Sequence, residues 1–133
     1  MDSTTALCFV LDDDPQVGRL ISLAVGEQAV SVEQFIDPGS LHAALRERTP
    51  ALVFLNVALG ASDAIEAIRS LSLLNFAGPV HLISDRDGAL LADVRLIGER
   101  YGLRMRPALA KPLRAEALRR IVHDESPAAA LPV

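Results

Sequence analysis

Four apolar runs of this 133-residue chain end in polar side chains that could bind a phosphate or a metal ion. These side chains are Asp12, Asp13 and Asp14, then Asn56, then Ser84 and Asp85, and finally Lys111. The adjacent carboxylates of Asp12 and Asp13 repel each other unless a cation lies between them. Carboxylate oxygens suit Mg²⁺, and a lysine with a hydroxyl can bind phosphoryl oxygens. The set indicates phosphoryl-transfer chemistry, which needs a metal ion and accurate positioning.

A simpler interpretation gives the acidic residues a purely structural role. Asp14 precedes Pro15, and an aspartate followed by proline is typical of a helix start, so we interpret Asp14 as a helix N-cap. A solvated loop is a weaker explanation for Asp12 and Asp13, because a serine and a lysine follow other apolar runs at matching points. We therefore keep the pair as candidate ligands.

The elements that would position these residues alternate between strand and helix. Five segments are expected strands, at residues 7–11, 30–36, 51–55, 80–83 and 103–109. The segment 30–36 is half polar, and Pro107 interrupts 103–109, so both are expected at sheet edges. Strands that alternate with helices predict an α/β fold, a doubly wound five-stranded parallel sheet with helices on both faces. Ligands of such sheets bind beyond the carboxyl ends of the strands, where the candidate residues lie.

The expected helices carry recognisable boundaries and apolar stripes. The first helix starts at Asp14-Pro15, Ser62 is a candidate cap for the third, and Gly102 is placed to end the fourth. The buried stripe of the first helix is expected to contain Val17, Leu20, Ile21, Ala24 and Val25.

Composition limits the class of protein. Half of the residues are apolar and the net charge is −4, which favours one globular domain and gives no support to a nucleic-acid or membrane partner. We expect a domain over 1–125 and a tail over 126–133. The single cysteine, Cys8, excludes a disulfide framework, and the start of the chain does not resemble a signal peptide, so we expect a cytoplasmic protein.

Four segments resemble, in order, the response-regulator receiver domains of two-component phosphorelay systems. They are FVLDDDPQVGRLI (9–21), ALVFLNVALGASDAIEAIRSL (51–71), PVHLIS (79–84) and LAKPLRAEALRRI (109–121). The resemblance implies a flavodoxin-like receiver fold, an acidic metal pocket at Asp12 and Asp13, a switch hydroxyl at Ser84 and a phosphate-pairing Lys111. It also implies a cis Lys111–Pro112 bond. Residues 102–118 further resemble receivers that precede cyclic-di-GMP phosphodiesterase domains.

The chain departs from the receiver pattern where phosphorylation matters most. The family's phospho-acceptor aspartate aligns with Asn56, and a neutral amide cannot form an acyl phosphate. Ala108 replaces the aromatic switch residue, and Asp85 follows the switch serine where a small residue is usual. We expect an atypical receiver that takes no phosphate at Asn56, binds Mg²⁺ weakly, if at all, through Asp12, Asp13 and Asn56, and signals through protein contacts rather than as an enzyme.

The expected partners are a sensor histidine kinase, another signalling protein or a second copy of the chain. Residues 86–133 carry 9 basic and 6 acidic side chains, whereas residues 1–85 carry 4 and 11. Seven arginines and the apolar Leu91, Val94 and Ala108 lie on the segment 90–122, so we expect any dimer contact there.

Two other functional classes fit the sequence less well. Asp12 and Asp14 also fit the nucleophile motif of haloacid-dehalogenase-like phosphatases, with Ser84 and Lys111 as later motifs. Such enzymes need a further pair of metal-binding acids, and the chain after Lys111 offers only Glu116, Asp124 and Glu125. DNA binding has little support, because no helix-turn-helix segment follows and the arginines lack interleaved aromatics. His42, His81 and His123 share no metal-binding spacing.

Overall fold

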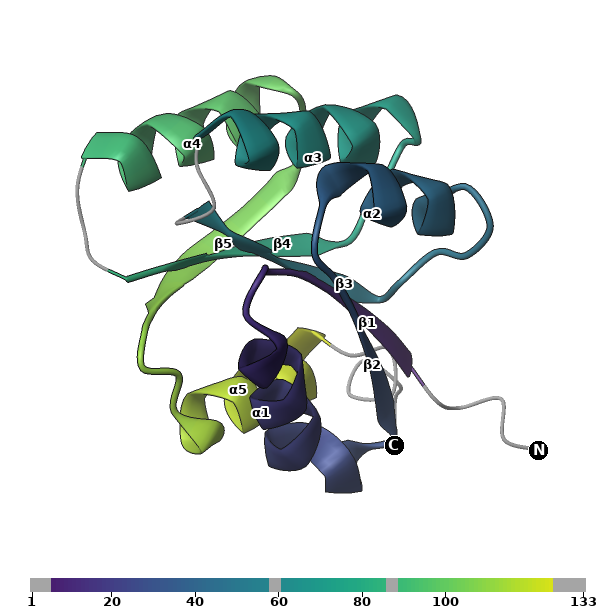
Figure 1. Ribbon diagram of the computed structural model, residues 1–133, viewed down its shortest axis with the longest axis vertical. Coiled ribbons are helices and arrows are strands. Elements are labelled where there is room, and N and C mark those ends of the chain that lie inside the picture. The colour runs from purple at the N-terminus through teal and green to yellow at the C-terminus, as the bar shows by residue number, and fades with distance from the viewer. Residues whose placement is uncertain (1–5, 58–60, 86–88, 126–133) are drawn as a thin grey trace.

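The computed structural model describes residues 6–57, 61–85 and 89–125, and a parallel sheet lies at the centre of this part (Figure 1). Its strands are β1 (Ala6–Leu11), β2 (Val30–Phe35), β3 (Leu52–Asn56), β4 (Pro79–Ser84) and β5 (Arg104–Ala110). Their spatial order is β2-β1-β3-β4-β5, and every pairing is parallel. The predicted five-stranded sheet and both predicted edge strands are confirmed.

Helices cover both faces of the sheet. They are α1 (Pro15–Val25), α2 (Pro38–Leu45), α3 (Ala61–Leu73), α4 (Ala89–Arg100) and α5 (Ala115–Glu125), with a short 3₁₀ turn, η1 (Gly26–Gln28), after α1. Figure 1 shows α2, α3 and α4 on one face and α1 with α5 on the other. A separate apolar cluster fills each layer, one around Phe9 and Leu55, the other around Val10 and Phe54. Alternate residues of the central strands therefore serve opposite cores, which explains why β1 and β3 are apolar throughout.

Two of the predicted helix boundaries are confirmed. The Asp14 carboxylate accepts a hydrogen bond from the backbone N–H of Gln16 and caps α1, with Pro15 in the first turn. Gly102 follows α4 with a φ of 83°, a backbone conformation that glycine adopts without steric cost.

Two other expectations about the helices are wrong. Ser62 lies inside α3, which begins at Ala61, so Ser62 is not the cap. Leu20 is 39 % exposed, because the side of α1 that meets the sheet is narrower than the apolar pattern suggests and Leu20 flanks it. Its neighbours Val17 and Ile21 are buried as predicted.

The remaining expectations concern the cysteine, membrane spans and the tail. Cys8 is a buried free thiol, and burial raises its pKa to about 12, so it is held as an unreactive thiol. Among the helices described, none has the length and apolar character needed to span a bilayer. The expected tail over 126–133 lies outside the described residues.

Candidate functional site at the carboxyl edge of the sheet

The strand register brings two candidate residues from neighbouring strands together. In the pairing of β1 with β3, Leu11 lies opposite Leu55. Asp12 and Asn56 are the next residues along each strand, so they lie side by side at the carboxyl ends, where adjacent strands are about 5 Å apart. Asp12 is fully buried and Asn56 is 2 % exposed, so a carboxylate and an amide lie in the interior at this edge.

The other two candidates come from the next strands of the same sheet. Ser84 pairs with Ala110 across β4 and β5, and the backbone N–H of Lys111 donates to the carbonyl of Ser84 at 2.9 Å. The Lys111–Pro112 bond is cis, as the resemblance implies. The four strand ends therefore converge as the sequence predicts.

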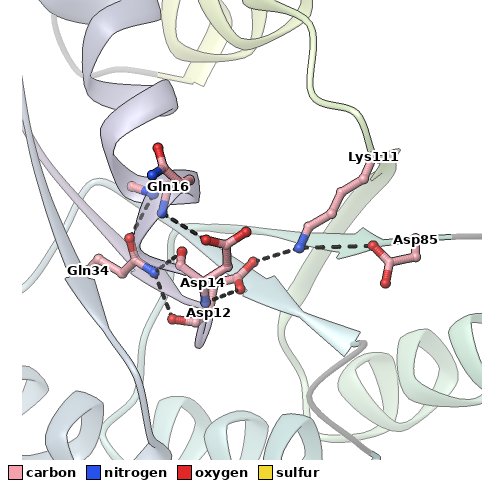
Figure 2. A network of polar contacts seen from close by, with 7 residues as sticks. Asp12, Asp14, Gln16, Gln34, Asp85 and Lys111 are labelled. Carbon is pink, nitrogen blue, oxygen red and sulfur yellow. Dashed lines mark hydrogen bonds and ion pairs between the residues drawn. The ribbon is translucent and has the colours of Figure 1, made fainter.

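An ion pair links the two ends of this row of residues. Lys111 Nζ lies 3.2 Å from Asp12 Oδ2 and 4.0 Å from Asp85 Oδ1 (Figure 2). Asp12 Oδ2 accepts no hydrogen bond of normal geometry, so its contact with Lys111 is electrostatic. The other oxygen, Oδ1, accepts from the backbone N–H of Asp14 at 2.9 Å. A buried carboxylate is stable only when a positive charge lies close to it, and Lys111 supplies that positive charge.

The neighbouring acid is placed differently. The side chain of Asp13 is exposed, whereas that of Asp12 is enclosed. The two carboxylates predicted as one acidic pocket thus differ in environment, and the buried one carries the ion pair. Asp85, which follows the serine, is also exposed and adds a second carboxylate near Lys111.

The donor set partly fits a magnesium ion. A buried carboxylate oxygen without a hydrogen-bond donor, at Asp12 Oδ2, is the kind of atom that a hard cation binds. In the part of the chain that the structure describes, no group of three or more histidine, cysteine or acidic side chains could hold a metal. Lys111 already neutralises Asp12, so a cation at this edge would compete with the lysine. A magnesium site made by Asp12, Asp13 and Asn56 therefore stays a prediction.

Sequence reasoning missed the side chain that holds the acidic loop. Gln34, near the end of β2, donates from Nε2 to the carbonyls of Asp12 and Asp14, and its Oε1 accepts from the N–H of Gly18 (Figure 2). A glutamine in a half-polar edge strand belongs to no motif. The available signal was Gly18, a glycine in a helix that is otherwise well formed.

Sequence reasoning also missed a second charged cluster, around the start of β5. Glu125, the last residue of α5, lies 2.6 Å from Arg106, 3.7 Å from Arg104 and 4.0 Å from the buried His81. His81 Nδ1 contacts the carbonyl of Pro107 at 3.2 Å, while Nε2 is buried without a hydrogen-bond partner. Burial lowers the pKa of His81, although the Pro107 carbonyl and Glu125 partly oppose that shift.

The other two histidines lie on helices. His42 Nδ1 is 2.9 Å from Ser70 Oγ and links α2 to α3, while His123 is exposed on α5.

One part of the expected dimer surface is wrong. Val94 is buried and cannot contribute to a surface contact, whereas Leu91 and Ala108 pack against the core on the α4 side but remain partly exposed. The exposed large apolar residues of α4 are Leu90 and Leu96. The arginines of α4, β5 and α5 nevertheless remain largely at the surface.

The geometry does not favour the phosphatase alternative. Asp14 is exposed and caps α1 through Gln16, while Asp12 is buried and paired with Lys111. A nucleophile and an acid-base partner would both have to be directed at one substrate. These two carboxylates are instead engaged in separate structural contacts.

Comparisons with known proteins agree with this geometry. No family model matches the sequence, and no curated protein matches it. Among solved structures, a response regulator receiver protein from Burkholderia phymatum shares 25% identity and a TM-score of 0.75, with 96% of this chain and 99% of that chain covered. A response regulator from Colwellia psychrerythraea shares 23% identity and a TM-score of 0.73, covering 92% and 97%. One from Thermotoga maritima shares 18% identity and a TM-score of 0.74, covering 90% and 96%. The chain therefore has the fold of the response-regulator receiver domains.

Proposed function

We propose that this chain is a receiver domain of the two-component type that accepts no phosphoryl group at position 56 and acts through protein contacts. The observation that carries the proposal is Asn56, a buried amide at the carboxyl end of the central strand β3. A receiver's phospho-acceptor is expected at that point, between the acidic loop and the lysine. An amide nitrogen or oxygen is too weak a nucleophile to form an acyl phosphate.

The rest of the edge supports a receiver rather than an unrelated α/β protein. Ser84 and Lys111 are joined through their backbones, and Lys111 reaches across to Asp12. A phosphate-pairing lysine and a switch hydroxyl would occupy these places in a receiver. A magnesium ion, if bound, would be held by Asp12, Asp13 and Asn56 and would screen negative charge at the edge.

Without phosphorylation, the domain would keep one conformation and act by binding its partners. We propose that the partner is a sensor histidine kinase, another signalling protein or a second copy of the chain, which binds on α4, β5 and α5. Exposed Leu90 and Leu96 with the arginine side chains give that surface apolar and cationic character. The resemblance to receivers that precede cyclic-di-GMP phosphodiesterase domains stays a prediction.

The test is phosphoryl uptake from acetyl phosphate with Mg²⁺, followed by intact mass. The chain itself is expected to gain no stable phosphoryl group, whereas Asn56→Asp is expected to gain one. Asn75→Asp is the matched control, because it adds the same charge at an exposed residue after α3. It is expected to stay unlabelled.

Three results would contradict the proposal. Labelling of the unaltered chain at Asp12 or Asp13 would show that the edge transfers phosphate without position 56. Failure of Asn56→Asp to label, while folded, would show that the edge is not a receiver site. Turnover of a generic phosphate ester by the unaltered chain would instead favour the phosphatase.

A further inference from the structure

The side-chain amide of Gln34 is inserted into the first turn of α1. In a regular α-helix the N–H of Gly18 would donate to the carbonyl of Asp14, four residues earlier. Here the Gly18 N–H donates to Gln34 Oε1 at 2.7 Å, and Gln34 Nε2 donates to that Asp14 carbonyl, also at 2.7 Å. The glutamine therefore bridges the two backbone groups that the helix would otherwise join directly.

The same amide reaches the residue that carries the buried charge. Gln34 Nε2 also donates to the carbonyl of Asp12 at 2.7 Å (Figure 2). Both ends of the three-residue loop Asp12–Asp14 are thus held by one nitrogen. Within that loop the Asp14 N–H donates to Asp12 Oδ1, which leaves Oδ2 toward Lys111.

Gly18 is required by this arrangement. A Cβ atom at position 18 would lie 2.9 Å from Gln34 Cβ and closer still to Gln34 Oε1, so the glutamine would have to move. A helix is less stable with glycine than with alanine at an interior position. Close approach of the Gln34 side chain explains why this buried position carries no side chain.

We propose that Gln34 is a positioning residue of the carboxyl-edge site, which fixes the backbone of Asp12–Asp14 and thereby aims the Asp12 carboxylate at Lys111. The proposal rests on the proposed function for the meaning of that edge. Its structural part, the control of the loop by one side chain, stands on the contacts alone.

The first arm of the test is amide hydrogen exchange measured by NMR. In Gln34→Ala the amides of Asp14 and Gly18 are expected to exchange at least tenfold faster, while the amide of Phe54 in β3 keeps its rate. Ser31→Ala, an exposed change on the same strand, is the control and should leave all three rates unaltered. Rates for Asp14 and Gly18 within twofold of the unaltered chain would overturn the proposal.

Gln34→Glu separates positioning from simple support. The carboxylate keeps an acceptor for the Gly18 N–H but loses the donor for the two carbonyls. Exchange is expected to stay slow at Gly18 and to rise at Asp14. Equal changes at both amides would indicate general loosening of the helix and would count against the proposal.

Gly18→Ala gives a test that remains valid if Gln34→Ala is poorly stable. In the unaltered chain the added methyl group displaces Gln34, so the melting temperature is expected to fall. In the Gln34→Ala background the amide is gone and only the Cβ atom of residue 34 still lies close, so the same change should lower the melting temperature by much less. An equal fall in both backgrounds would overturn the proposed contact.

The last arm connects the contact to the site. In the Asn56→Asp chain, adding Gln34→Ala is expected to slow phosphoryl uptake from acetyl phosphate at least tenfold, whereas adding Ser31→Ala should not. An unchanged rate would overturn the positioning role. If Asn56→Asp takes no phosphoryl group at all, the proposed function fails, and the exchange rates still decide the role of Gln34.

Discussion

The charged cluster at the carboxyl edge and the charged cluster around the start of β5 differ in how their charges are placed. At the carboxyl edge a fully buried acid, Asp12, meets one partly exposed lysine, and a side chain from β2 fixes the loop around it. Around the start of β5, Glu125 is shared by two half-exposed arginines and lies 4.0 Å from the buried His81. The first cluster consists of one ion pair whose acid is fully buried. In the second cluster the two arginines that share the acid are partly exposed to solvent. We infer that the first directs a carboxylate and the second fastens the end of α5 to the sheet.

Removal of the lysine should give the largest effect. Lys111→Met keeps the aliphatic stem but leaves Asp12 buried without its cation, so the free energy of unfolding is expected to fall by about 3 kcal/mol. Lys111 is 23% exposed, which limits the loss to the lower part of the range for buried pairs. Urea unfolding provides the measurement.

The control for this change is Arg120→Met, because Arg120 is exposed on α5. It should change the free energy of unfolding by no more than about 0.5 kcal/mol. If both variants lose the same free energy of unfolding, Lys111 does not stabilise the buried Asp12. The contrast between the two clusters then disappears.

Removal of the shared acid should have a smaller effect. Glu125→Gln is expected to lower the free energy of unfolding by about 1 kcal/mol, because Arg104 and Arg106 remain solvated when it is lost. High salt should reduce the difference between the two proteins, since exposed charges are screened. Glu66→Gln, an exposed change on α3, is the control. A loss as large as that of Lys111→Met would mean that the two clusters are energetically alike.

The pH dependence of stability should reveal the buried imidazole. Burial lowers the pKa of His81 in the folded chain, so the unfolded chain takes up a proton first as the pH falls through about 6.5. Stability is therefore lost on the acid side, and the loss from this group between pH 7.5 and 5.5 should not exceed about 1.4 kcal/mol. Melts of the unaltered chain and of His81→Leu at both pH values measure it.

The His81→Leu variant should lose less stability in acid than the unaltered chain. His123→Leu, which retains His81, should show the larger loss. If His81→Leu and the unaltered chain lose the same amount, the imidazole near Glu125 does not carry the acid sensitivity.

The sequence predicted the fold and the carboxyl edge because both depend on local patterns. Apolar runs ended by Asp12, Asn56, Ser84 and Lys111 place these residues at strand ends, and parallel strands bring such ends together. One helix boundary was less accurate, because α3 begins at Ala61, one residue before the predicted cap Ser62.

The contacts that the sequence did not reveal all join distant elements. Gln34 and Gly18 are 16 residues apart, and Glu125 meets side chains from β4 and β5. Neither contact leaves a periodic pattern or a motif in the sequence, because each depends on how elements that are distant in the chain pack against each other. Val94, assigned to a surface, is buried for the same reason: the side of α4 that faces the core is set by packing.

We propose that Asp12, Asp13 and position 56 share one site whose third charge is missing. Two unit charges about 4 Å apart at an effective dielectric of about 20 repel by roughly 4 kcal/mol, which Lys111 and solvent reduce. Asn56→Asp is therefore expected to destabilise the metal-free chain by about 1 kcal/mol after screening.

The most direct measurement is a thermal melt of the unaltered chain, Asn56→Asp and the control Asn75→Asp across a Mg²⁺ series at constant ionic strength. We predict that Asn56→Asp melts lowest without metal and regains most as Mg²⁺ rises, because a ligand stabilises the folded state that binds it best. The other two proteins should respond little. Equal metal-free melting temperatures and equal Mg²⁺ responses for Asn56→Asp and Asn75→Asp would contradict the account, because position 56 would then share no site with Asp12 and Asp13.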